Sequence, residues 1–271
     1  MKNMMSVDLE DFYCDLPFSK WKNYEGRAVH NTQKILDLFE KYNVKATFFT
    51  LGFIAEKYPE LIEEIQSKGH EIASHGYQHL DARNISKNDF ENDLKKSLNI
   101  LESITKEKIK GFRAPFFSVN KKNVWVLDIL KKYLKYDSSI FPAKTPMYGI
   151  SDAITHPYKI SEDSPLTENK NGDFYEIPPL ILKLPLRNIP VAGGFFLRFL
   201  PIQLIKFSIK KMNEKGFPAM CYIHPKDLDP EMPKIPQYAW HYYWGLNNST
   251  QKFENLLKNF EFNSVRENLK I

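Results

Sequence analysis

The chain has 271 residues, of which 42% are hydrophobic, 26% charged and 14% aromatic. This composition is typical of one large globular domain or two small ones, and it excludes a disordered chain, a coiled coil and a disulfide-stapled miniprotein. The net charge is +5, but only six of the 38 basic residues are arginine. Because the lysines are scattered among glutamates, no nucleic-acid partner is expected.

Strand and helix patterns alternate along the first half of the chain. The helix pattern over 59–68 stops at Gly69, and Ser86 with Asp89 three positions later is typical of a helix N-terminus. Taken in order, the periodicity predicts a strand at 6–7, a helix over 32–42, a strand over 46–51, a helix over 59–68, a strand over 71–74, a helix from Ser86, a strand at 112–113, a helix over 124–134 and a strand over 135–137.

The pattern weakens in the second half. Pro, Ser, Asp and Asn dominate residues 141–175, which predicts a long irregular excursion. Three prolines within 175–186 allow at most an edge strand there. Beyond them the pattern predicts a helix over 202–215, a buried strand over 219–223, a helix over 249–259 and a strand near Phe262.

The alternation favours parallel strands covered by helices. In such folds the chemistry gathers at the C-terminal ends of the strands. Polar residues follow the predicted strands here: Asp8, Glu10, Asp11, His75, Arg113, Asp137 and His224.

The N-terminus and the two cysteines indicate a cytoplasmic protein. Cys14 and Cys221 have no metal-type spacing, and we expect both to be reduced thiols. No hydrophobic signal region follows Met1 and no stretch approaches about 18 uninterrupted apolar residues, so no transmembrane helix is expected. The apolar stretch 191–207 leaves two interpretations open: peripheral contact with the inner face of a membrane, or the hydrophobic side of a packed helix.

The most informative segment is His75-Gly76-Tyr77-Gln78-His79. Two histidines four positions apart, on one helical turn or in a tight loop, can bind one metal ion. With one carboxylate from the segment Asp8-Leu9-Glu10-Asp11 they would form the open ligand set of a hydrolytic zinc-type site. Taken alone, the histidine pair is more typical of surface or capping histidines, and the acidic segment is more typical of a turn after a strand.

The order of these segments resembles the polysaccharide deacetylases, the NodB-homology carbohydrate esterases of family 4. The resemblance lies in Thr47-Phe48-Phe49, the segment from Gly69 to His79, Gly111-Phe112-Arg113-Ala114-Pro115-Phe116 and Tyr222-Ile223-His224-Pro225. It implies a single domain over 1–271 with a distorted, incomplete (β/α) barrel. The core would span about 4–140 and 217–228, with irregular elaborations at about 141–200 and 229–271.

A narrower resemblance points to the subgroup near bacterial exopolysaccharide and surface-glycan gene clusters, which carries a C-terminal extension. It rests on the segments that begin at Ser6, Tyr136 and Pro190, and on Asp229-Pro230 after His224-Pro225. The implied reaction is removal of an N-acetyl or related acyl group from an amino sugar. The sugar would belong to a surface polysaccharide or to a lipid-linked precursor.

The resemblance also implies a divalent metal, with zinc preferred and cobalt or nickel as alternatives. His75, His79 and one of two acids, Glu10 or Asp11, would hold it. The sequence leaves the choice between these two acids open.

The remaining roles follow the same resemblance. Asp8 would be the general base and pair with Arg113, His224 would be the general acid, and the backbone N–H of Phe116 would stabilise the oxyanion. Aromatic candidates for stacking on sugar rings are Phe117, Tyr148, Tyr222 and Trp240.

The chain departs from the family pattern in three places. The first motif is usually two adjacent aspartates, the third usually ends in Gly where Phe117 stands, and the fourth, an Asp followed by Trp, is not evident, so the role of Asp137 stays open. Two alternative functions follow: hydrolysis of a small cyclic amide on the same fold, and non-catalytic glycan binding. The sequence identifies neither the sugar nor the oligomeric state.

Overall fold

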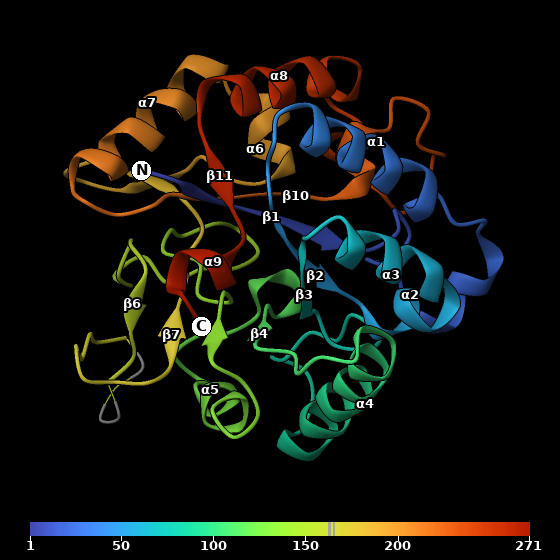
Figure 1. Ribbon diagram of the computed structural model, residues 1–271, viewed down its shortest axis with the longest axis horizontal. Helices are drawn as coiled ribbons and strands as arrows, with labels where there is room; N and C mark the ends of the chain where they lie inside the picture. Colours follow the sequence, from blue (N-terminus) through green and yellow to red (C-terminus); the bar gives the residue numbers. More distant parts are fainter. Residues whose placement is uncertain (162–163, 165) are drawn as a thin grey trace.

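An open, mostly parallel β-sheet forms the centre of the molecule (Figure 1). The structure, a computed structural model, describes residues 1–161, 164 and 166–271. Within these residues every strand pair of the sheet is parallel except β6–β7. The strand order is β10 (Met220–Ile223), β1 (Asn3–Leu9), β2 (Thr47–Thr50), β3 (Glu71–Ser74), β4 (Gly111–Phe112), β5 (Tyr136–Asp137), β7 (Tyr175–Glu176) and β6 (Tyr158–Lys159). Because the order does not return to β10, the barrel is incomplete, and the predicted fold class is confirmed.

Helices cover the sheet and follow the predicted alternation. Ser86 accepts a hydrogen bond from the backbone N–H of Asp89 at the start of α4, as its spacing predicts. Gly69, with φ of 79°, follows α3 in a left-handed conformation that glycine adopts without strain. The α-helices are α1 (Ala28–Lys41), α2 (Gly52–Lys57), α3 (Pro59–Ser67), α4 (Lys87–Thr105), α5 (Trp125–Leu130), α6 (Gly194–Phe199), α7 (Ile202–Glu214), α8 (Leu246–Asn259) and α9 (Val265–Leu269).

Short 3-10 turns lie in the connections between these elements: η1 (Phe18–Asn23), η2 (Pro115–Phe117), η3 (Pro225–Leu228) and η4 (Trp240–Tyr242). Two of them, η2 and η3, directly follow the strands β4 and β10, where the predicted motifs stand.

Strand β1 lies in the middle of the core. All seven of its residues are buried, and it pairs with β10 on one side and β2 on the other. Asp8 stands near the C-terminal end of this buried strand, and Glu10 and Asp11 follow its last residue, so the three acids gather at the C-terminal edge of the sheet near its centre.

The strand register places the predicted motifs side by side at the C-terminal ends of neighbouring strands. Val7 pairs with Ile223, so Asp8 and His224 are the next residues on adjacent strands. Likewise Ser74 pairs with Phe112, which puts His75 beside Arg113.

The second half of the chain departs from the prediction in several elements. The segment 175–186 does not form one edge strand: β7 lies inside the sheet between β5 and β6, and β8 (Ile181–Lys183) pairs only with β9 (Asn188–Pro190) in a separate hairpin. The prolines lie between these strands or after them, which is why the strand is divided. Residues 162, 163 and 165, within the predicted 141–200 elaboration, lie outside the described residues.

The C-terminal segment returns to the sheet. Strand β11 (Phe262–Asn263) pairs with the start of β1, as the pattern near Phe262 predicts. The short helix α9 was not predicted; Ser264 caps it by accepting the backbone N–H of Glu267.

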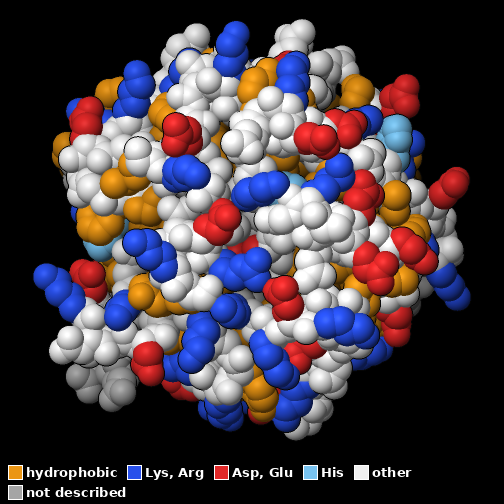
Figure 2. Space-filling view, in the orientation of Figure 1, with side chains coloured by type: hydrophobic (Ala, Val, Ile, Leu, Met, Phe, Trp, Pro, Cys, Tyr) orange, Lys and Arg blue, Asp and Glu red, His pale blue; other side chains and the backbone are white. Residues whose placement is uncertain are grey.

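The surface carries mixed charge. On the face shown in Figure 2, lysine and arginine side chains are interspersed with acidic ones. None of the helices in the described ranges combines the length and the apolar character that crossing a membrane requires.

Candidate active site

A cleft of about 160 Å³ opens at the C-terminal ends of the central strands. Most of the residues predicted from the sequence line it: Asp8, Glu10, His75, His79, Phe116, Phe117, Tyr148, Tyr222 and His224. Arg113, which is fully buried, contacts Asp8 from behind the cleft wall.

Glu10, His75 and His79 form a possible metal site. One ligand atom from each of these buried residues lies within 4.8 Å of the other two. Two imidazoles and one carboxylate are a ligand set that hydrolytic metal sites use, since three protein ligands leave a position open.

The hydrogen bonds of the two histidines fit such a site. Nδ1 of His75 lies 2.7 Å from the carbonyl oxygen of Arg113, and Nδ1 of His79 lies 3.0 Å from that of Cys14. Carbonyl oxygens only accept, so both Nδ1 atoms carry the hydrogen, and in the neutral ring the lone pair is on Nε2. Burial lowers the pKa of His75 to about 4, so this ring is neutral.

The contact between His79 and Glu10 requires a positive charge. Nε2 of His79 lies 2.8 Å from Oε2 of Glu10, and that buried oxygen has no other partner among the described residues. Burial lowers the pKa of His79, but the Glu10 and Asp15 carboxylates together raise it above its usual value. Either a proton on His79 or a metal ion satisfies this pair, and the neighbouring neutral His75 favours the metal.

Strained backbone gathers at the cleft. Three of the six described non-glycine residues with positive φ line the cleft: φ is 58° at His79, 58° at Phe116 and 46° at Phe117. Left-handed conformations of such residues each cost about 1–3 kcal/mol, and they cluster at functional sites. The rings of His79 and Phe116 are in contact, with centroids 4.5 Å apart.

Asp8 is held by Arg113. Nη1 of Arg113 donates to Oδ1 of Asp8 at 2.5 Å and to Oγ of Ser6 at 2.9 Å. Nη2 of Arg113 donates to Oγ of Ser138 at 2.9 Å, and the guanidinium lies 4.2 Å from the ring centroid of Phe49. A guanidinium fixed on several sides holds the Asp8 carboxylate in one orientation.

His224 is oriented by an aspartate that the sequence analysis missed. Nδ1 of His224 lies 2.8 Å from Oδ2 of Asp227, and Nε of Arg198 donates to Oδ1 of the same carboxylate at 3.1 Å. Nε2 of His224 faces Oδ2 of Asp8 at 3.7 Å. Burial lowers the pKa of His224, but the Asp227 and Glu10 carboxylates together raise it above its usual value. Burial raises the pKa of Asp227, but His224 and Arg198 lower it to about 2. The spacing of three residues within one turn was the signal available in the sequence.

Lys226 was also missed. Its Nζ atom donates to Oε1 of Glu10 at 2.7 Å and to Oδ2 of Asp15 at 2.9 Å. No motif in the sequence singles out this lysine, because its partners are more than 200 residues away along the chain.

The structure brings Glu10, and not Asp11, to the two histidines. The Asp11 carboxylate instead accepts the backbone N–H groups of Phe12, Arg27 and Ala28. The Arg27 and Ala28 groups lie at the start of α1, so of the two acids only Glu10 lies together with the histidines.

The aromatic candidates separate into two groups. Phe117, Tyr148 and Tyr222 line the cleft and pack together, with the Phe117 ring centroid 5.6 Å from that of Tyr148 and 5.2 Å from that of Tyr222. Trp240, in contrast, is 63% exposed on η4 and does not line the cleft. The structure therefore does not bring this candidate into the cleft, although its neighbours His241 and Tyr242 line it.

Asp137 lies beneath the site and does not line the cleft. Its Oδ1 accepts a hydrogen bond from Ser139 at 2.5 Å, and Ser139 Oγ accepts the backbone N–H of Ala114 at 2.7 Å. Asp137 thus supports the turn that follows Arg113.

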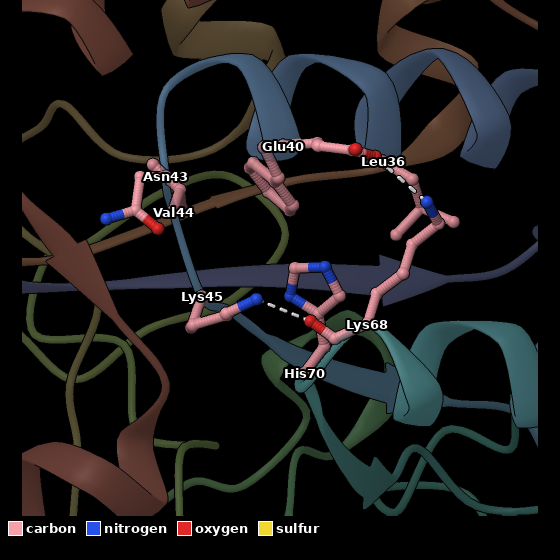
Figure 3. A pocket seen from close by; sticks show the side chains of 8 residues that line it. Leu36, Glu40, Asn43, Val44, Lys45, Lys68 and His70 are labelled. Atoms are coloured by element: carbon pink, nitrogen blue, oxygen red, sulfur yellow. Dashed lines mark hydrogen bonds and ion pairs between the residues drawn. The ribbon is translucent and has the colours of Figure 1, made fainter.

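A separate pocket lies at the opposite ends of the strands (Figure 3). It has a volume of about 260 Å³, and Lys45, Lys68 and His70 line it under α1. Nδ1 of His70 accepts the backbone N–H of Ala46, and burial lowers the pKa of His70 to about 4. None of the predicted site residues lines this pocket.

Two family profiles match the chain side by side. Residues 21–133 match the family described as polysaccharide deacetylase, and residues 138–270 match the family described as a domain of unknown function, DUF3473. The predicted resemblance to the polysaccharide deacetylases is confirmed.

Relatives of known name agree with these matches. A peptidoglycan deacetylase of Helicobacter pylori is 32% identical over 215 residues, which are 77% of this chain and 65% of that protein. The chain spans 34%, 65% and 41% of the length of three such relatives, so it corresponds to only part of each.

Solved structures share the fold. A probable polysaccharide deacetylase from Pseudomonas aeruginosa has a TM-score of 0.59 at 15% identity, covering 98% of this chain and 88% of that one. The Puue allantoinase has a TM-score of 0.60 at 14% identity, covering 97% and 87% of the two chains.

Proposed function

We propose that this chain, whose residues 21–133 match the polysaccharide deacetylase family, is a metal-dependent hydrolase that removes an acetyl or related acyl group from an amino sugar of a glycan. One observation carries the proposal: the set Glu10, His75 and His79 shares a cleft with Asp8 and His224. A metal ligand set, a carboxylate as base and a histidine as acid at one site can together hydrolyse an unactivated amide.

Glu10, His75 and His79 would hold the metal, with zinc preferred and cobalt or nickel as alternatives. A divalent cation there supplies Lewis acidity toward a water molecule and toward the carbonyl oxygen of the acyl group. The rest of the reaction falls to the side chains around it.

Asp8 takes the proton of the attacking water, since one of its oxygens is held by Arg113 and the other faces the cleft side of His224. His224, with its Nδ1 fixed by Asp227, gives a proton from Nε2 to the leaving nitrogen as the C–N bond breaks. The backbone N–H of Phe116 is the donor for the oxyanion, because the left-handed turn at this residue lies in the cleft wall. The products are a carboxylate and a free amine.

The substrate we propose is an amino sugar of a surface polysaccharide or of a lipid-linked precursor. Aromatic faces at Phe117, Tyr148 and Tyr222 give the cleft the lining that sugar rings stack on. The names of relatives support a glycan substrate, among them a chitooligosaccharide deacetylase of Sinorhizobium fredii.

A cytoplasmic location and contact with a membrane surface are part of the same proposal. Cys14 and Cys221 are buried and unpaired, which fits a reducing compartment. Within the 191–207 stretch, Phe199 and Phe207 are about half exposed while Leu197 is buried. Binding of the protein to vesicles that contain anionic lipid tests the membrane contact.

One observation favours a second candidate, hydrolysis of a small cyclic amide. The fold is shared with an allantoinase, and the cleft of about 160 Å³ suits a small substrate. The amide chemistry would be the same, but ring opening releases no acetate.

The experiment compares the two reactions directly. Wild-type protein and His75→Ala are incubated with zinc and either N-acetylglucosamine oligomers or a cyclic ureide, and acetate release and ring opening are measured. Acetate release by the wild type alone supports the deacetylase. Ring opening without acetate supports the second candidate, and binding of the oligomers without either reaction supports a non-catalytic glycan-binding protein.

A further inference from the structure

Lys226 bridges two carboxylates at the edge of the candidate metal site. Its Nζ atom lies 2.7 Å from Oε1 of Glu10 and 2.9 Å from Oδ2 of Asp15, and its side chain is only 11% exposed. An ammonium group held this far from solvent interacts strongly with charges around it, because water screens it poorly.

The two oxygens of Glu10 have different surroundings. Oε1 accepts the hydrogen bond of Lys226, while Oε2 faces Nε2 of His79 at 2.8 Å. A carboxylate oxygen that is committed to an ammonium is a poorer metal ligand than its free neighbour. The geometry therefore leaves Oε2 as the oxygen that faces His79 and is available to a metal ion.

Each carboxylate at the site is paired with a nearby cation. Arg113 balances Asp8 from behind the cleft, whereas among the lysines and arginines of the described residues only Lys226 forms ion pairs with Glu10 and Asp15. Removing the lysine charge would leave these two carboxylates unbalanced beside the metal site.

We propose that Lys226 is a positioning residue that restricts Glu10 to a single metal-facing oxygen and holds down the affinity of the site for the cation. The inference rests on the metal site of the proposed function. By neutralising part of the Glu10 charge, Lys226 would weaken the donation of that charge to the metal ion. A metal ion that receives less charge from its carboxylate ligand keeps more of its Lewis acidity.

The test is metal binding by purified protein, measured with a competing chromophoric chelator. Replacing Lys226 with Met keeps most of the side-chain length and removes the charge, so Kd for Zn²⁺ is expected to fall by at least about tenfold. The visible absorption spectrum of the Co²⁺-loaded protein is expected to change, because the second oxygen of Glu10 becomes free. Lys226→Arg, which retains the charge, should stay within about threefold of wild type.

The matched control is Lys41→Met, which removes a lysine that pairs with Glu254 at 2.6 Å far from the cleft. This variant should bind Zn²⁺ as the wild type does. Thermal unfolding with and without Zn²⁺ separates tighter binding from a loss of stability in the variant. If binding is tighter, adding Zn²⁺ must raise the unfolding midpoint of Lys226→Met by more than it raises that of wild type.

Equal or weaker Zn²⁺ binding by Lys226→Met, together with an unchanged Co²⁺ spectrum, overturns the inference and leaves the metal site intact. If wild-type protein binds no metal, the proposed function fails and the inference falls with it.

Discussion

Nδ1 of His224 lies 2.8 Å from Oδ2 of Asp227, three residues further along the same turn. Because this contact comes from one short segment, the general-acid histidine and the carboxylate that orients it are built together after β10. The Asp227 carboxylate is also fixed by Arg198, so the imidazole has one orientation, with Nε2 toward Asp8.

Replacing Asp227 with Asn should lower kcat for acetate release by roughly 10- to 100-fold, because the imidazole loses its fixed orientation and the stabilisation of its protonated form. Zn²⁺ affinity should hardly change, since Asp227 is not in the ligand set. Steady-state kinetics and zinc titration check both statements. A variant with wild-type kcat would show that Asp227 does not orient the acid.

Replacing His79 with Ala should abolish near-stoichiometric zinc binding, because the site would keep only one imidazole. The control is His30→Ala, which removes an exposed histidine on α1. Elemental analysis of the purified proteins gives the metal content. Full loading of His79→Ala would place the metal elsewhere.

Glu10 and Asp11 should respond in opposite ways to substitution. Glu10→Gln should lose zinc and keep most of its stability, whereas Asp11→Asn should keep zinc and lose about 2 kcal/mol of stability. The Asp11 carboxylate accepts the backbone N–H groups of Arg27 and Ala28 at the start of α1 and that of its neighbour Phe12. Zinc titration and urea unfolding separate the two effects. Zinc loss in Asp11→Asn with retention in Glu10→Gln would reverse the assignment.

The buried acids Asp137 and Glu176 should make stability depend on pH. Burial raises the pKa of Asp137 to about 6, and burial together with the Asp137 charge raises that of Glu176 well above its usual range. Because the pKa values of both acids are higher in the folded than in the unfolded protein, the folded protein binds more protons in this pH range. The contribution of this pair to stability is therefore greatest below about pH 4 and falls as pH rises through about 6.

Glu176→Gln removes one of these acids and keeps the shape. The variant should be about 1–2 kcal/mol more stable than wild type near pH 8 and little changed near pH 4. Urea unfolding at both values measures this. An equal effect at the two pH values would mean that the pair does not titrate between them.

Much of the site was predictable because it stands on regular strands. The strands before Asp8, His75, Arg113 and His224 have clear apolar patterns, and parallel strands bring their C-terminal ends together. Local spacing also predicted the cap at Ser86 and the stop at Gly69.

The parts that were missed depend on contacts distant in sequence. Lys226 contacts Glu10 and Asp15 only in the folded chain, and no local sequence pattern predicts these contacts. The direction of Trp240 follows from an irregular segment, and the choice between Glu10 and Asp11 depends on where α1 begins. Each of these is decided by tertiary packing, which periodicity does not encode.

The most direct measurement is acetate release from N-acetylglucosamine oligomers by the zinc-loaded protein, by the same protein after complete chelation, and after zinc is restored. The account predicts release that chelation abolishes and zinc recovers, with none from His75→Ala. Full activity after complete chelation, or full zinc loading of His75→Ala, would contradict it.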